Sequence, residues 1–151
     1  MKQPLTSTFL TLALTAAALP ACDGGPPASA TDLGGRWITA NGNLEVEIGP
    51  CESALCGTVT QVLANHSMSD PGAQMKPADG KDPLGMKILS SFVPSSGGKW
   101  AGSIYNRENG KTYDCLLSLK SADELEVRGY VALSLFGKTQ IWTRVTERAA
   151  R

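Results

Sequence analysis

Residues whose side chains could do chemistry are few in this chain and lie far apart in its sequence. The single histidine, His66, and the absence of any C-x-x-C pair leave no zinc site to predict. Asp70, Asp79 and Asp82 do not follow the spacing of a calcium-binding loop. No nucleophile elbow, phosphate-binding loop or dinucleotide fingerprint occurs either. We therefore expect no catalytic residue, metal or cofactor, and predict a binding protein rather than an enzyme.

The cysteines suggest a structural disulfide and a buried thiol. Cys51 and Cys56 flank the segment 52–55 between two strand-like segments. Cysteines that face each other across a short hairpin loop meet the Cα separation of a disulfide, so we predict a bridge between them. Cys115 alternates with apolar residues along Tyr113–Leu119. Because no cationic residue adjoins it on that face to lower its pKa, we expect an unreactive, buried thiol.

Residues 1–21 have the features of a secretory signal peptide, with Lys2 ahead of an apolar run too short to span a membrane. Two processing sites compete. The tripeptide 28–30, Ala-Ser-Ala, has the small-x-small form, whereas Leu-Pro-Ala-Cys ending at Cys22 resembles a bacterial lipobox, whose cysteine becomes lipidated. We favour a lipoprotein in which Cys22 begins a flexible Gly/Pro-rich tether over residues 22–33. A soluble periplasmic protein is the alternative.

The elements that must position any site are short strands. The predicted strands are 37–39, 44–48, 55–62, 86–93, 99–106, 111–119, 124–133 and 139–146. Gly- and Asn-rich turns separate them, and no amphipathic helix is predicted after the signal peptide. Glu45 and Glu47 share one face of Leu44–Ile48 that should point to water, so we do not expect them to act as a catalytic carboxylate pair.

About eight short strands joined by short links predict an all-β fold, an antiparallel up-and-down β-barrel over residues 34–146 with a C-terminal tail, 147–151. Closure removes the exposed edges of an open sheet, and the interior of such a barrel either fills with side chains or holds one small ligand. Residues 64–83 lack any periodicity. A loop of this length is functional or disordered, so it is either a flap over one barrel end or mobile surface decoration.

Composition excludes two classes of protein. Fourteen Lys and Arg residues balance fourteen Asp and Glu residues, so no basic face is available for nucleic acid. No apolar stretch reaches the roughly 18 residues that a membrane-spanning helix needs. A membrane contact is therefore expected only through the N-terminal lipid.

An ordered series of short motifs resembles one bacterial family. The motifs are Gly34–Thr39, Val46–Ile48, Pro50–Cys51, Leu55–Gly57, Pro83–Leu89, Trp100–Tyr105, Gly110–Tyr113, Leu125–Tyr130 and Gly137–Arg144. The series is similar to the exported family DUF2147, a domain of unknown function. This resemblance implies a lipocalin-like barrel and brings no settled activity or ligand. Gly35 and Trp37 match the G-x-W of a first lipocalin strand, and the resemblance then implies that Arg144 lies over Trp37 and closes one barrel end by a cation–π contact.

The remaining candidates for a binding site are polar and aromatic residues near a possible cavity. They are Tyr105, Tyr113, Arg128, Tyr130 and Trp142. These residue types fit a ligand pocket, which is mostly apolar with a few placed polar groups. The alternatives are that the aromatic residues only fill the core and that Arg128, opposite Leu125 and Val127, makes an exterior salt bridge.

These observations lead to one main interpretation and two alternatives. The main interpretation is a periplasmic, lipocalin-like protein that binds a small amphiphilic or apolar ligand and is held to a cell-envelope membrane by its lipid. The first alternative is a protein-binding periplasmic module, such as a small barrel protease inhibitor. The second is a structural envelope lipoprotein that has no ligand.

Overall fold

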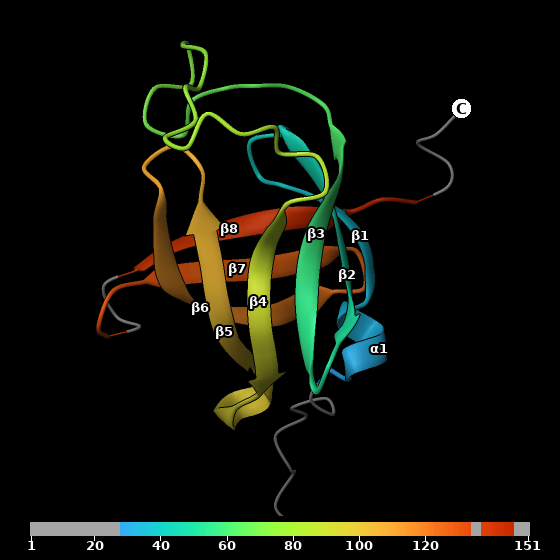
Figure 1. Ribbon diagram of the computed structural model, residues 1–151. Helices are drawn as coiled ribbons and strands as arrows, with labels where there is room; N and C mark the ends of the chain where they lie inside the picture. The colour runs from blue at the N-terminus through green and yellow to red at the C-terminus, as the bar shows by residue number, and fades with distance from the viewer. Residues whose placement is uncertain (1–27, 134–136, 147–151) are drawn as a thin grey trace, which may run out of the picture.

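The alternating segments of the sequence form eight antiparallel strands that close into a barrel in the order β1 to β8 (Figure 1). The computed structural model describes residues 28–133 and 137–146. The strands are β1 (Gly35–Ile38), β2 (Leu44–Cys51), β3 (Ala54–Val62), β4 (Lys87–Pro94), β5 (Trp100–Asn106), β6 (Lys111–Ser121), β7 (Glu124–Tyr130) and β8 (Gly137–Arg144). The predicted up-and-down barrel is confirmed, although β7 ends at Tyr130, before the predicted boundary at residue 133.

Closure depends on the first and last strands. β1 pairs with β8 in antiparallel register, with Trp37 opposite Arg144 and Ile38 opposite Thr143. Every other pair joins neighbours in sequence, so each strand has a hydrogen-bonded partner on both sides. This arrangement leaves no sheet edge exposed for association with another chain.

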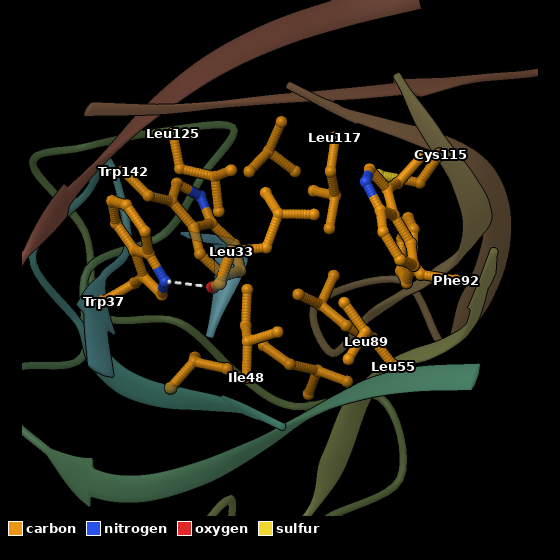
Figure 2. Packing of buried hydrophobic residues seen from close by; sticks show 14 of the residues in the cluster. Leu33, Trp37, Ile48, Leu55, Leu89, Phe92, Cys115, Leu117, Leu125 and Trp142 are labelled. Atoms are coloured by element: carbon orange, nitrogen blue, oxygen red, sulfur yellow. Dashed lines mark hydrogen bonds between the residues drawn. The ribbon is translucent and has the colours of Figure 1, made fainter. Parts of the chain in front are cut away.

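The barrel interior holds one cluster of buried apolar side chains. Leu33 projects into the middle of this cluster from the short helix α1 (Ala30–Leu33) and is completely buried (Figure 2). The indole Nε1 of Trp37 donates a hydrogen bond to the Leu33 carbonyl oxygen at 3.0 Å. The fully buried members include Trp37, Phe92, Leu89, Leu117, Leu125 and Trp142. The part of the barrel interior around Leu33 is therefore filled with side chains.

Part of the predicted tether belongs to the folded domain. The Ser29 hydroxyl and the Asp32 carboxylate form a capping box at the start of α1. The carbonyl oxygen of Ala28 accepts a hydrogen bond from Trp100 Nε1 at 3.0 Å. The prediction of a flexible tether was therefore wrong for residues 28–33, because burial of Leu33 fixes this segment against the barrel. The signal peptide, Cys22, the rest of the tether and the tail 147–151 lie outside the described residues.

The predicted disulfide is present between Cys51 and Cys56, whose Cα atoms are 5.8 Å apart across the β2–β3 hairpin. Cys115 is a buried thiol on β6, and its burial raises its pKa to about 12. A thiol with that pKa is protonated at neutral pH and is a poor nucleophile.

One short helix besides α1 occurs in the described part of the chain. A 3-10 helix, η1 (Ser96–Gly98), lies in the connection between β4 and β5. The part of the chain that the structure describes contains no helix with the length and hydropathy of a membrane span.

Candidate functional site

One end of the barrel is sealed around Arg144. Its guanidinium carbon lies 4.1 Å from the centroid of the Trp37 ring. The guanidinium also donates hydrogen bonds to three carbonyl oxygens, from Nη1 to Gly34 at 2.8 Å, from Nη2 to Asp32 at 2.7 Å and from Nε to Ala122 at 2.7 Å. One side chain thus joins β8, α1 with the residue that follows it, and the β6–β7 turn.

Gly35 provides the space that Arg144 needs. Gly35 has a φ of 110°, a conformation that residues with a side chain rarely adopt. A Cβ atom at this position would lie 3.0 Å from Nη1 of Arg144. The structure therefore brings together Gly35, Trp37 and Arg144, the three residues that the family resemblance singled out.

The opposite end of the barrel is hollow and contains a cavity of about 570 Å³. Its apolar lining comes from the strands and includes Leu44, Ile88, Ile104, Val127 and Trp142. Polar residues of the connecting turns also line it and include Asn41, Asn43, Arg107 and Asn109. The cavity thus has an apolar part formed by strand side chains and a polar part to which the turns contribute.

Residues 64–83 lie across this open end (Figure 1), and Met68, Ser69 and Met75 of this segment line the cavity. This position matches the flap interpretation of the sequence rather than surface decoration. We refer to residues 64–83 as the flap. Methionine side chains adapt their shape easily, so Met68 and Met75 suit a cover over a site of variable contents.

Glu108, in the β5–β6 turn, holds the tip of the flap. Its carboxylate accepts hydrogen bonds from the hydroxyl of Ser67, from the hydroxyl of Ser69 at 2.8 Å and from the backbone N–H of Met68 at 2.9 Å. Donation by the two serine hydroxyls is the main cause that lowers the pKa of Glu108 below its ordinary value. An ionised Glu108 therefore fastens the flap to the barrel.

Two further contacts fix the flap. The side-chain amide of Asn43 exchanges two hydrogen bonds with the backbone of His66, at 2.8 Å and 2.7 Å. The Tyr105 hydroxyl donates to Asp79 at 2.9 Å. The flap is thus attached to the β1–β2 turn, to β5 and to the β5–β6 turn.

The structure places four of the five predicted ligand contacts around this cavity. Tyr113 and Trp142 line it from β6 and β8, and Tyr105 and Tyr130 border it. Arg128 is not part of the cavity lining, and its Nη1 donates to the Thr139 hydroxyl at 2.6 Å on the neighbouring strand. Arg128 therefore lies on the exterior of the barrel.

One of two acidic positions on β2 differs from what the sequence suggested. Glu45 was expected to point to water, but it is 6% exposed. Its carboxylate accepts hydrogen bonds from Arg36 Nη1 and from the Thr60 hydroxyl, both at 3.1 Å. These partners explain how a carboxylate can be buried on the outer face of β2. Glu47 on the same strand is exposed.

The residue that sequence reasoning missed is Arg107. It lies in the β5–β6 turn, lines the cavity and is only 6% exposed. Its Nε is buried and has no hydrogen-bond partner. Turns are ordinarily polar and exposed, so no periodic pattern distinguished this arginine from other surface charges.

No cluster of three or more His, Cys, Asp or Glu side chains suited to a metal ion occurs within residues 28–133 and 137–146. His66 is exposed and forms an isolated β-bridge with Gln74 inside the flap. Asp70 and Asp82 accept hydrogen bonds from backbone N–H groups of their own turns. The polar residues of the flap thus shape the flap itself.

An eight-stranded closed barrel, with one end sealed by a Trp–Arg pair and a cavity at the other, is a lipocalin-like fold. The chain belongs to the family described as "Uncharacterized protein conserved in bacteria (DUF2147)", whose profile matches residues 35–144. A solved structure with the same fold is protein HP1028 from Helicobacter pylori, described as belonging to the lipocalin family. The TM-score is 0.59 at 20% sequence identity, with 78% of this chain and 85% of that chain covered. A search of curated proteins found no match.

Proposed function

We propose that this protein is an exported binding protein for a small amphiphilic or apolar ligand that occupies the cavity at the open end of the barrel. The observation that carries this proposal is the cavity itself. Its volume of about 570 Å³ falls within the range of about 300–1,000 Å³ that small-molecule sites occupy. An apolar wall with a polar rim matches the two parts of an amphiphile.

The energetics favour an aliphatic or aromatic occupant. Ile104, Val127 and Trp142 present apolar surface to the cavity, and each methylene group that leaves water for such a surface gains about 0.8 kcal/mol. A chain of several methylene groups would therefore bind without any specific polar contact. Polar groups at the rim would then decide which amphiphile binds.

The flap would control entry. Met68 and Met75 border the cavity, so a ligand that enters from this end must pass the segment that Glu108 and Asn43 hold in place. These contacts are a few hydrogen bonds, most of them only partly buried, and a segment held in this way opens more readily than a packed core. Binding and release would therefore proceed through local opening of the flap while the barrel stays folded.

Export is supported by the Cys51–Cys56 disulfide, because disulfides persist in oxidising compartments. A lipid on Cys22 would anchor the chain through its N-terminal segment. Ala28, bonded to Trp100, lies at the sealed end of the barrel. With this anchor the sealed end would face the membrane and the cavity mouth would face away from it.

Incorporation of a radioactive fatty acid tests the anchor. We expect label in the wild-type protein expressed in its bacterial host and none in Cys22→Ser. Equal incorporation by the two proteins would remove the lipoprotein part of the proposal and leave a soluble periplasmic protein.

Native mass spectrometry of the protein purified from its host tests the binding function. We expect a co-purifying adduct with the mass of a small amphiphile, released by organic extraction. A protein adduct instead would favour the alternative, a protein-binding periplasmic module. A protein that carries nothing, and that takes up no added amphiphile, would favour a structural envelope protein.

A further inference from the structure

Arg107 is a buried cation at the cavity and has no counter-ion among the residues that the structure describes. Its Nε has no hydrogen-bond partner, and its guanidinium makes no ion pair or side-chain hydrogen bond with any residue of 28–133 or 137–146. The backbone at this position is fixed, because the Arg107 carbonyl oxygen accepts a hydrogen bond from Ala78 N–H at 2.8 Å. The backbone that carries the charged group is therefore fixed, and the guanidinium has no partner among the described residues.

Three acidic side chains border the region around Arg107, and the carboxylate of each one accepts hydrogen bonds from donors other than Arg107. Glu108 accepts three hydrogen bonds from the flap. Asp79 accepts one from the Tyr105 hydroxyl and one from a backbone N–H at 3.0 Å. Asp82 accepts one from a backbone N–H at 2.9 Å. None of them lies within ion-pair distance of Arg107.

A buried charge that has lost its water and gained no partner destabilises a protein, so such groups are normally paired or coordinated. We propose that the partner of Arg107 is the ligand, and that the ligand is an amphiphile with an oxyanion head group, a carboxylate or a phosphate. This inference rests on the proposed function, because it requires that the cavity holds an amphiphile. The planar guanidinium can donate two parallel hydrogen bonds to either kind of head group.

The position of Arg107 also defines how the ligand is oriented. Arg107 belongs to a turn at the open end, whereas Val127 and Trp142 line the cavity from the strands and belong to the buried cluster. A head group at Arg107 would therefore leave the apolar chain to lie against these side chains. Tyr113 offers a further contact, because its hydroxyl oxygen accepts a hydrogen bond from Asn109 Nδ2 at 2.7 Å and its own proton can be donated to the head group.

Three probes with the same chain and different head groups test the inference. Dodecanoate, dodecyl phosphate and 1-dodecanol are titrated into the full mature protein at pH 7.5, below micelle-forming concentrations. The variants are Arg107→Met, which removes the charge, and Arg107→Lys, which keeps the charge without the planar fork. Arg128→Gln is the control, because Arg128 lies outside the cavity lining. Binding of dodecanol shows that each variant retains a folded cavity.

We expect the wild type to bind at least one anionic probe about tenfold or more tightly than dodecanol. Arg107→Met should abolish this preference and leave dodecanol binding unchanged. Arg107→Lys should keep part of the preference for the anionic probe, and Arg128→Gln should keep all of that preference. The preferred anion tells a carboxylate from a phosphate ligand. If dodecanol binds as well as the anions, or if Arg107→Met weakens all three probes equally, the inference fails and the proposed function stands. If no probe binds the wild type, both fail.

Discussion

Arg144 and Trp37 lie opposite each other across the seam where the last strand of the barrel meets the first, with the guanidinium carbon 4.1 Å from the ring centroid. The pair does more than close the sheet. Through the hydrogen bonds of Arg144 to Asp32 and Gly34 it also fastens the segment that carries Leu33 into the core. The sealed end thus forms one unit that includes the N-terminal helix α1.

Replacement of Arg144 by alanine should lower the free energy of unfolding by about 2–4 kcal/mol, because three charged hydrogen bonds and a cation–π contact are lost together. Urea denaturation followed by tryptophan fluorescence measures this change. Lys120→Ala, at an exposed position on β6, is the control and should change stability by less than about 0.5 kcal/mol. Equal effects of the two variants would show that Arg144 does not hold the sealed end together.

Glu108→Gln should loosen the flap. A carboxylate whose folded-state pKa is lowered stabilises the fold above its ordinary pKa, near 4.5, and loses this contribution as the pH falls through the lower folded-state value. The stability difference between wild type and Glu108→Gln should therefore be largest at neutral pH and shrink below about pH 4.5. Hydrogen exchange at neutral pH should be faster at residues 67–69 of the variant.

Glu124→Gln is the control for this experiment, since Glu124 is an exposed carboxylate at the far end of β7. It should leave exchange at residues 67–69 unchanged. If Glu108→Gln also left these residues as protected as in the wild type, the hydrogen bonds of Glu108 would not be what holds the flap.

Gly102→Ala should destabilise the barrel by about 1–3 kcal/mol through overpacking. A Cβ at Gly102 would lie 2.6 Å from the Ser90 carbonyl oxygen and 2.7 Å from the Phe92 ring. The Ser90 oxygen belongs to the backbone of β4 and has little freedom to move. Gly49→Ala, where a Cβ would meet nothing within 4 Å, should have a much smaller effect. Thermal unfolding compares the two variants, and similar melting temperatures would contradict the tight packing of β4 against β5.

The barrel could be predicted from the sequence because its determinants are local. Alternation in segments such as Leu44–Ile48 defines strands, and short turns between them allow only neighbours to pair. The disulfide was predictable for the same reason, because Cys51 and Cys56 are close in sequence. The contact between Arg144 and Trp37 joins the two ends of the domain, and only the resemblance to a family suggested it.

The contacts that shape the open end were not predictable from patterns. Glu108 binds Ser67, which is 41 positions away in sequence, and the flap has no periodicity that would predict where it docks. Leu33 was assigned to a tether because Gly and Pro precede it, and only the folded barrel provides the site that buries it. That Arg107 has no partner among the described residues can be seen only in the folded protein. Each of these features depends on what surrounds a residue rather than on its neighbours in sequence.

A substitution that places a side chain inside the cavity is the most direct test of the proposed binding site. Gly129 lines the cavity, and a Cβ there would meet only ordinary contacts, the nearest at 3.5 Å from Ile104. Gly129→Leu should therefore place a side chain in the cavity of a folded protein. Gly49→Leu makes the same change on β2, where a Cβ would meet open space.

The measurement is the affinity for N-phenyl-1-naphthylamine, a neutral probe whose fluorescence rises in apolar surroundings, with circular dichroism as the check that both variants are folded. We predict that Gly129→Leu binds the probe at least about tenfold more weakly than the wild type and that Gly49→Leu binds it as the wild type does. Wild-type affinity in a folded Gly129→Leu protein would contradict the claim that the ligand occupies the barrel cavity.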